Sequence, residues 1–194
     1  MYAGASASSD SSSYAPGISR RFLIFYPQGL VTTYYPAEGP DGYTPKSGQG
    51  ITGGYGTSGN VLGISWETGD TVTSVIAADG SISLSGVSYV RLDPLNNTRF
   101  EGTYERLGGE PAWPSITFRG DGSFSDEGVA GFTGLLILSS SAPKGSGTYS
   151  ISNNTLHLRY DNGGKIDMGI YVAPQFLSDR EQIELAGFSF ARSK

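Results

Sequence analysis

The sequence of 194 residues contains no cysteine and only one histidine, His157. The lack of cysteine excludes disulfides, thiolate metal sites, iron–sulfur clusters and cysteine nucleophiles. A metal site would need carboxylates grouped around the one imidazole, and no carboxylate cluster has the spacing for one. We therefore expect neither a metal nor another cofactor.

Two further features are missing: a surplus of positive charge and a long apolar run. The chain has 13 Lys and Arg against 18 Asp and Glu, for a formal net charge of −5. A binding site for nucleic acid needs basic side chains that neutralise phosphates. The most apolar runs, 22–26 and 134–138, have the length of strands and not the about 18 residues of a membrane helix. We expect no nucleic-acid partner and no membrane span.

Glycine, in contrast, is abundant, with 29 residues, and 12% of the chain is aromatic. Pairs that tolerate positive φ, such as Asp79-Gly80 and Asp121-Gly122, are typical of tight hairpins. Between these turns the apolar residues alternate with period two, as in Leu156, Leu158 and Tyr160, which is typical of half-buried strands. The pattern predicts an all-β protein.

Segments in the first half of the chain are similar in sequence to segments in the second half. Residues 53–66 lie over 147–160 without a gap, at a shift of 94 positions. Residues 25–31 match 118–124 at a shift of 93, and 82–91 match 183–192 at a shift of 101. Chance similarity between glycine-rich strands is the alternative, but the matches keep their order and the phase of their alternation.

These matches predict two tandem antiparallel meander units, 1–95 and 96–194, each a small barrel or half-barrel. The boundary is expected near 93–98, where a proline and paired asparagines suit a linker. Two triplets should point into the two interiors: Leu62, Ile64 and Trp66 in the first unit, and Leu156, Leu158 and Tyr160 in the second.

The second unit resembles bacterial lipocalin-like domains of unassigned function. The resemblance is carried by 100–104 (FEGTY), 115–124 (SITFRGDGSF), 145–151 (GSGTYSI) and 154–160 (NTLHLRY), and more weakly by the first unit. It implies small antiparallel barrels or half-barrels, some with an apolar interior that holds a ligand, and it implies no reaction. The first unit departs from the pattern, with Gln28 at the position of Asp121.

Residues that could carry catalysis are few. His157 falls on the outward phase of its strand beside Arg159, and we interpret it as a solvated surface residue, because a general base needs an orienting partner. The acids Asp126, Glu127, Asp161 and Asp167 could serve a glycoside hydrolase if they faced each other across a cleft. We interpret them as ordinary turn and edge acids, and we do not expect an enzyme.

Four aromatic residues are the candidates for ligand binding: Tyr34, Tyr35 and Tyr43 around the first long loop, and Trp113 between two prolines. Aromatic faces near loops can stack on ligands or anchor a partner, although packing is the alternative for each of them. Our leading hypothesis is a non-catalytic β-barrel module that binds a small hydrophobic ligand. The alternative is a structural or protein-interaction module that assembles, or self-associates, through sheet edges or aromatic loops.

Overall fold

The computed structural model describes residues 1–7, 18–45, 50–107, 114–132, 144–172 and 180–193. These residues confirm the all-β prediction, since α1 (Val129–Phe132) is the only α-helix among them. No helix in these ranges has the length and apolarity to cross a membrane. The chain forms two compact units: Met1–Tyr35 with Thr44–Asp93, and Pro36–Tyr43 with Pro94–Lys194.

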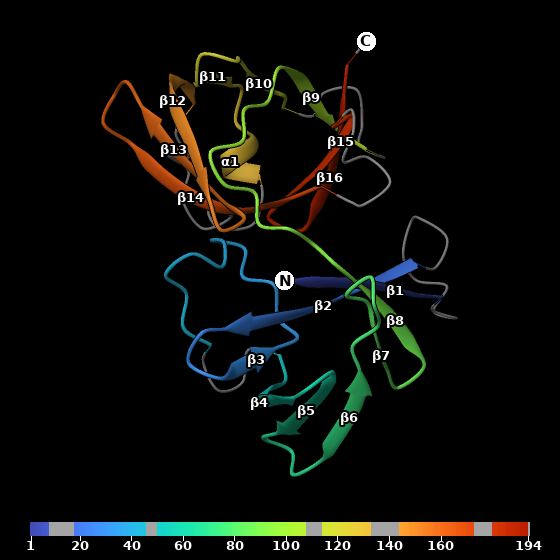
Figure 1. The fold of residues 1–194 in the computed structure, drawn as a ribbon. Helices are drawn as coiled ribbons and strands as arrows, with labels where there is room; N and C mark the ends of the chain where they lie inside the picture. The colour runs from blue at the N-terminus through green and yellow to red at the C-terminus, as the bar shows by residue number, and fades with distance from the viewer. Residues whose placement is uncertain (8–17, 46–49, 108–113, 133–143, 173–179, 194) are drawn as a thin grey trace. The chain divides into compact units, whose positions relative to one another are not determined.

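The first unit is an open antiparallel sheet, in the hydrogen-bonded order β6-β5-β4-β3-β2-β1-β8-β7 (Figure 1). Its strands are β1 (Tyr2–Ala7), β2 (Ile18–Tyr26), β3 (Leu30–Thr32), β4 (Thr52–Ser58), β5 (Val61–Trp66), β6 (Thr71–Val75), β7 (Ile82–Leu84) and β8 (Val87–Arg91).

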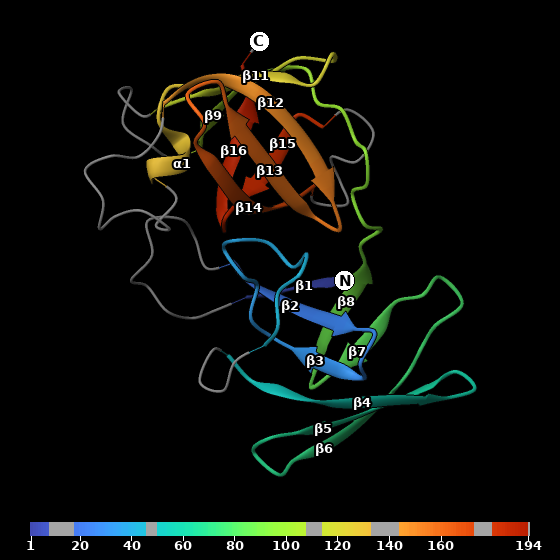
Figure 2. The same ribbon diagram turned by 90° about the vertical axis from the view of Figure 1, so that its left-hand side faces the viewer.

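The second unit is a closed barrel, in the order β10-β11-β12-β13-β14-β15-β16-β9. Figure 2 shows β12, β13 and β14 as long neighbouring strands of its wall. The strands are β9 (Gly102–Arg106), β10 (Ile116–Phe118), β11 (Ser123–Asp126), β12 (Gly145–Ser152), β13 (Thr155–Tyr160), β14 (Lys165–Tyr171), β15 (Gln182–Leu185) and β16 (Phe188–Arg192).

The two units share a strand register in the block that matches at a shift of 94. In the first unit Gly53 pairs with Trp66, and in the second Gly147 pairs with Tyr160. Both glycines are required by packing, because a Cβ at either position would collide with the backbone of the facing strand. Glycine at this point therefore sets how closely the two strands of each hairpin approach.

The units differ in closure. In the second unit β14 pairs with β15 through Ile170 and Leu185. In the first unit no backbone ladder joins β6 to β7 among the described residues. A side-chain bond stands in its place, since the backbone N–H of Ser83 donates to Ser74 Oγ at 3.2 Å. The first unit is thus a half-barrel whose edge strands β6 and β7 are not joined by a backbone ladder.

The second barrel is filled by its own side chains. Its largest fully buried side chains include Phe100, Tyr104, Phe118, Phe124 and Phe190. The rings touch: Tyr104 and Phe118 lie edge to face with centroids 5.9 Å apart. An eight-stranded barrel is just wide enough to be filled by side chains or to hold one small ligand, and here buried aromatic and aliphatic side chains occupy the core.

The first unit has a smaller core, made of Leu23, Val31, Leu62, Ile64, Ile82, Leu84, Val87 and Tyr89. Phe25, Tyr55 and Trp66 pack against this core but are only partly buried. The inward direction predicted for both triplets is confirmed, with one difference. Tyr160 is 5% exposed, whereas its counterpart Trp66 keeps part of its surface in solvent.

The interpretation of Asp126 as an exposed turn acid is wrong, because this side chain is buried. Its Oδ1 accepts hydrogen bonds from the backbone N–H groups of Gly128 (2.8 Å) and Val129 (2.6 Å) at the start of α1. Its Oδ2 accepts one from the Tyr160 hydroxyl at 2.6 Å. Burial and this neighbouring carboxylate raise the pKa of Tyr160. Asp126 thus joins α1 to the barrel wall, and these hydrogen bonds offset the cost of burying its polar carboxyl group.

Candidate functional site

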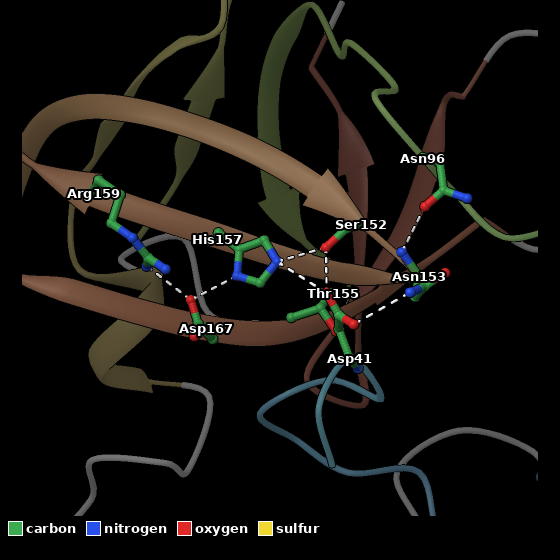
Figure 3. Close-up of polar contacts among 8 residues, drawn as sticks. All are labelled: Asp41, Asn96, Ser152, Asn153, Thr155, His157, Arg159 and Asp167. Atoms are coloured by element: carbon green, nitrogen blue, oxygen red, sulfur yellow. Dashed lines mark hydrogen bonds and ion pairs between the residues drawn. The ribbon is translucent and has the colours of Figure 1, made fainter. Parts of the chain in front are cut away.

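The most connected polar cluster lies on the outer face of β13 and β14, where residues 36–43 pack against the second barrel (Figure 3). We call residues Pro36–Tyr43 the docked segment. Its backbone joins the barrel wall, since the Gly169 N–H donates to the Ala37 carbonyl at 2.7 Å and the Asp41 N–H donates to Thr155 Oγ1 at 2.8 Å. Thr155 is therefore buried although it points away from the barrel interior.

Gly39 allows this close approach. Its φ is +94°, in the left-handed region, and a Cβ there would collide with the Thr155 side chain. A larger residue at position 39 would thus be strained in its backbone and would push the docked segment off β13.

His157 stands at the centre of the cluster. Its Nδ1 lies 2.9 Å from Asp167 Oδ1, and its Nε2 lies 2.9 Å from Ser152 Oγ. Arg159 donates to the same Asp167 oxygen at 2.8 Å. The expectation of a solvated histidine without an orienting partner is wrong, because the side chain is only 20% exposed and both ring nitrogens have partners.

Asp41 brings a second carboxylate to the cluster from the docked segment. It accepts hydrogen bonds from the Ser152 hydroxyl and from Asn153 Nδ2, the latter at 3.2 Å, and it lies 3.7 Å from His157 Nε2. The bonds from Ser152 and Asn153, followed by the charge of His157, lower the pKa of Asp41.

Asp167 carries the other carboxylate on β14. Partial burial raises its pKa, but the hydrogen bonds and charges of Arg159 and His157 outweigh burial and leave the pKa lowered. Both carboxylates of the cluster therefore stay ionised at neutral pH, on either side of the imidazole.

Ser152, His157 and Asp167 follow the order of a Ser-His-Asp relay, so their capacity for nucleophilic catalysis can be judged from their contacts. The Ser152 hydroxyl donates its proton to Asp41, not to the imidazole. The neighbouring N–H of Asn153 already donates to Asn96 Oδ1 at 2.8 Å and cannot stabilise an oxyanion as well. The Asp41 charge beside Ser152 would also oppose an oxyanion. The contacts suit attachment of the docked segment better than acyl transfer.

Three of the four carboxylates considered for glycoside hydrolysis form hydrogen bonds with other groups of the second unit. Asp126 bonds α1 and Tyr160, Glu127 accepts from Ser115 Oγ at 2.9 Å, and Asp167 bonds His157 and Arg159. In the described ranges no three His, Cys, Asp or Glu side chains are grouped to hold a metal ion.

A cleft of about 270 Å³ lies in the first unit, where β4 begins and β5 ends. It is lined by Leu30, Pro45, Thr52, Gly53, Gly54, Ser65, Trp66 and Glu67. A more open groove shares Gly54 and Ser65 with it. Leu30 is 39% exposed, so apolar surface is available at the rim.

The three described members of the four aromatic residues predicted to bind a ligand belong to different units. Tyr34 and Tyr35 belong to the first unit and Tyr43 to the second, and Trp113 lies outside the described residues. Tyr35 packs on Phe22 with ring centroids 4.9 Å apart. None of the three described tyrosines lines the cleft. Their role in binding stays a prediction.

Sequence reasoning found neither the polar cluster around His157 nor the cleft beside Trp66. Ser152, Asp167 and Asp41 are far apart in the chain and carry no motif, and no local signal could have joined them. The cleft had a partial signal, because Trp66 occupies the position of Tyr160 but is followed by a turn with two acids, Glu67 and Asp70.

Comparison with protein-family models, with curated proteins and with solved structures finds no match. The lipocalin-like resemblance therefore stays a prediction. The function must be argued from the fold, from the polar cluster around His157 and from the cleft of the first unit.

Proposed function

We propose that this protein is a non-catalytic β-barrel module that binds a small hydrophobic ligand through its first unit. The observation that carries the proposal is the cleft of about 270 Å³ beside Trp66. Ligand sites are concave and mostly apolar, with a few polar groups that fix orientation. Leu30, Pro45 and Trp66 supply the apolar wall.

The second unit has the role of a scaffold in this proposal. Its interior is filled by buried side chains, so a ligand there would have to displace core residues. Its polar cluster holds the docked segment through contacts that occupy the Ser152 hydroxyl and both nitrogens of His157. These contacts support a non-catalytic role.

We also place the lipocalin-like resemblance and the tandem duplication within this proposal. An eight-stranded up-and-down barrel is the architecture expected of lipocalin-like domains, and the second unit has that strand order. The shared register of the β4–β5 and β12–β13 hairpins supports duplication.

A titration with hexanol, monitored through the amide shifts in two-dimensional NMR spectra, tests the proposal. We expect saturable shifts at Gly53, Gly54 and Ser65, which line the cleft. Trp66→Ala should weaken binding about tenfold, because it removes the largest apolar wall. Leu30→Ser, at the exposed rim, tests the same site if Trp66→Ala unfolds. Leu107→Ser changes an exposed leucine of the second unit; this variant is the control and should bind normally. An absence of saturable shifts, or shifts confined to the second barrel, would refute the proposal.

A second candidate function is assembly through sheet edges, which the open edges of β6 and β7 favour. Val75 on β6 is 60% exposed, and an exposed edge strand can pair with another chain. Light scattering after size-exclusion chromatography tests it. A concentration-dependent dimer that is lost in Val75→Lys would support assembly, and a monomer at all concentrations would exclude this version.

A further inference from the structure

We infer that His157 is held as an imidazolium between Asp41 and Asp167, and that its second proton controls how firmly the docked segment binds the second barrel. Figure 3 shows the imidazole ring between the Ser152 hydroxyl on β12, Asp167 on β14 and Asp41 on the docked segment. This proton-dependent contact lies within the second unit and does not involve the ligand cleft of the first.

Both nitrogens of the ring face hydrogen-bond acceptors. Nδ1 lies 2.9 Å from Asp167 Oδ1, and an ionised carboxylate can only accept. Nε2 lies 2.9 Å from Ser152 Oγ. This hydroxyl already donates its proton to Asp41, so its oxygen can only accept from the ring. A neutral imidazole has one N–H group and an imidazolium has two, so the contacts of the ring are complete only when His157 carries both protons.

The charges around the ring also favour a cation. Arg159 donates to the Asp167 oxygen that faces the ring. Asp41, 3.7 Å from Nε2, forms no ion pair with a Lys or Arg among the described residues. A proton on His157 therefore supplies the positive charge that Asp41 otherwise lacks. β12 adds no charged side chain, and those of the docked segment, β13 and β14 are Glu38, Asp41, Arg159, Lys165 and Asp167.

Loss of the second proton would weaken the attachment of the docked segment. A neutral ring leaves either Asp167 or Ser152 facing a nitrogen lone pair, and it removes the positive charge beside Asp41. Because the docked state holds the protonated ring, this stabilisation is complete in mildly acidic solution and is lost as pH rises past the ordinary histidine range, about pH 6.5. The carboxylates set the acidic limit, since their pKa values are lowered.

The charged groups of this contact occur in the second unit only, yet the segment that they hold is part of a connection of the first. At the positions 94 residues before His157, Arg159 and Asp167, the first unit has neutral residues, namely Gly63, Ser65 and Thr73. The docked segment lies in the connection between β3 and β4. The protonation of His157 therefore decides how firmly that connection is anchored.

Amide hydrogen exchange of the full chain, followed by NMR, measures the attachment. Protection at Asp41 and Gly169, corrected for the intrinsic rate, should fall about three- to tenfold between about pH 6 and about pH 8.5, because a partly exposed charge contact is lost. Protection at Tyr160, whose N–H donates to the Gly164 carbonyl at the other end of the hairpin, should not change. His157 is the only histidine of the chain, so its ring signals need no assignment, and both nitrogens should carry protons at about pH 6.

Two variants assign the pH dependence to His157. His157→Gln should lower protection at Gly169 to the level of the unmodified chain at high pH and remove the dependence on pH. Arg159→Gln removes a fixed charge that bonds Asp167, and it should lower protection at every pH but keep the dependence. The amino group of Met1 also titrates in this range, because burial lowers its pKa. It belongs to the first unit and is intact in both variants.

Three results would overturn the assignment to His157. The first is constant protection at Gly169 while the ring loses its proton. The second is a pH dependence that survives in His157→Gln. The third is a ring that carries a single proton at about pH 6. A parallel loss of protection at Tyr160 would also overturn it, because the barrel itself would then be opening.

Discussion

The two units follow the same meander, yet the second closes into a barrel and the first does not. The two units are equivalent as far as Ile76 and Ile170, each of which donates its N–H to the carbonyl of a matching turn residue, Asn60 and Asn154. The difference begins after these residues. From there the first unit reaches Ile82 in six positions, and the second reaches Ile183 in thirteen. The longer connection accompanies a longer β14 that pairs with β15.

A second difference lies in the connection after the third strand of each meander. In the second unit β11 ends at Asp126, which caps α1 and holds Tyr160. In the first unit no helix comes after β3 in the described residues up to Tyr35, and Pro36–Tyr43 belongs to the second unit. The comparison teaches that two meanders whose hairpins share a register can differ in closure when their connections differ.

The largest expected effect comes from truncating equivalent core residues. Leu158 and Ile64 are both fully buried and lie 94 positions apart. Leu158→Ala should cost about 4 kcal/mol and Ile64→Ala about 2 kcal/mol of unfolding free energy, because an open half-barrel can collapse around a cavity more easily than a closed barrel. Urea unfolding curves measure both. A larger loss for Ile64→Ala would contradict the argument from closure.

Removing the carboxylate that supports α1 should have the next largest effect. Asp126→Asn should cost about 2–3 kcal/mol, because both carboxyl oxygens accept buried hydrogen bonds and the amide group of Asn has only one acceptor oxygen. Tyr160→Phe removes only the hydroxyl bond and should cost about 1 kcal/mol. Trp66→Phe, the matched change in the first unit, has no such bond to lose. Thermal unfolding by circular dichroism gives the order, and equal losses for all three variants would contradict the capping role.

A smaller effect is expected at the gap between β6 and β7. Ser74→Ala removes the acceptor of the Ser83 N–H and should cost about 1 kcal/mol. Hydrogen exchange at Ser83 should become faster, while exchange at Leu185, on the closed side of the second barrel, should not change. If the Ser83 amide stays protected from exchange in Ser74→Ala, a contact other than this hydrogen bond holds β6 and β7 together.

The smallest effect is the pH dependence of the docked segment, because the carboxylates that hold it, Asp41 and Asp167, are only partly buried. The pKa values of Asp41 and Asp167 are lowered below their ordinary value of 3.8. Their contribution to stability is therefore complete above about pH 4 and disappears as pH falls through the lowered values.

Amide exchange at Asp41 and Gly169, whose N–H groups hold the docked segment, should accelerate below pH 4 beyond the intrinsic rate. Asp41→Asn should make exchange at both sites faster at neutral pH and less dependent on acid. If Asp41→Asn leaves exchange at Gly169 unchanged, the Asp41 contacts do not hold the segment.

Sequence reasoning reached the fold because its signals are local. The alternation at Leu156, Leu158 and Tyr160 and the turn residues between strands depend on neighbours a few positions away, and the structure confirms both the strands and their inward faces. His157 and Asp126 were misjudged for the opposite reason. Part of each environment comes from a distant residue, Asp41 for His157 and Tyr160 for Asp126, which is brought there only when the chain folds.

The sequence by itself determined the strand-rich character of this protein and the inward and outward phases of its hairpins, since strand geometry has a period of two residues and acts between neighbours. The tertiary structure decided that one unit closes, that residues 36–43 pack on the wall of the second barrel, and that Trp66, Glu67 and Thr52 share a cleft. Closure, docking and clefts depend on contacts between distant segments, and no local pattern encodes where such segments meet.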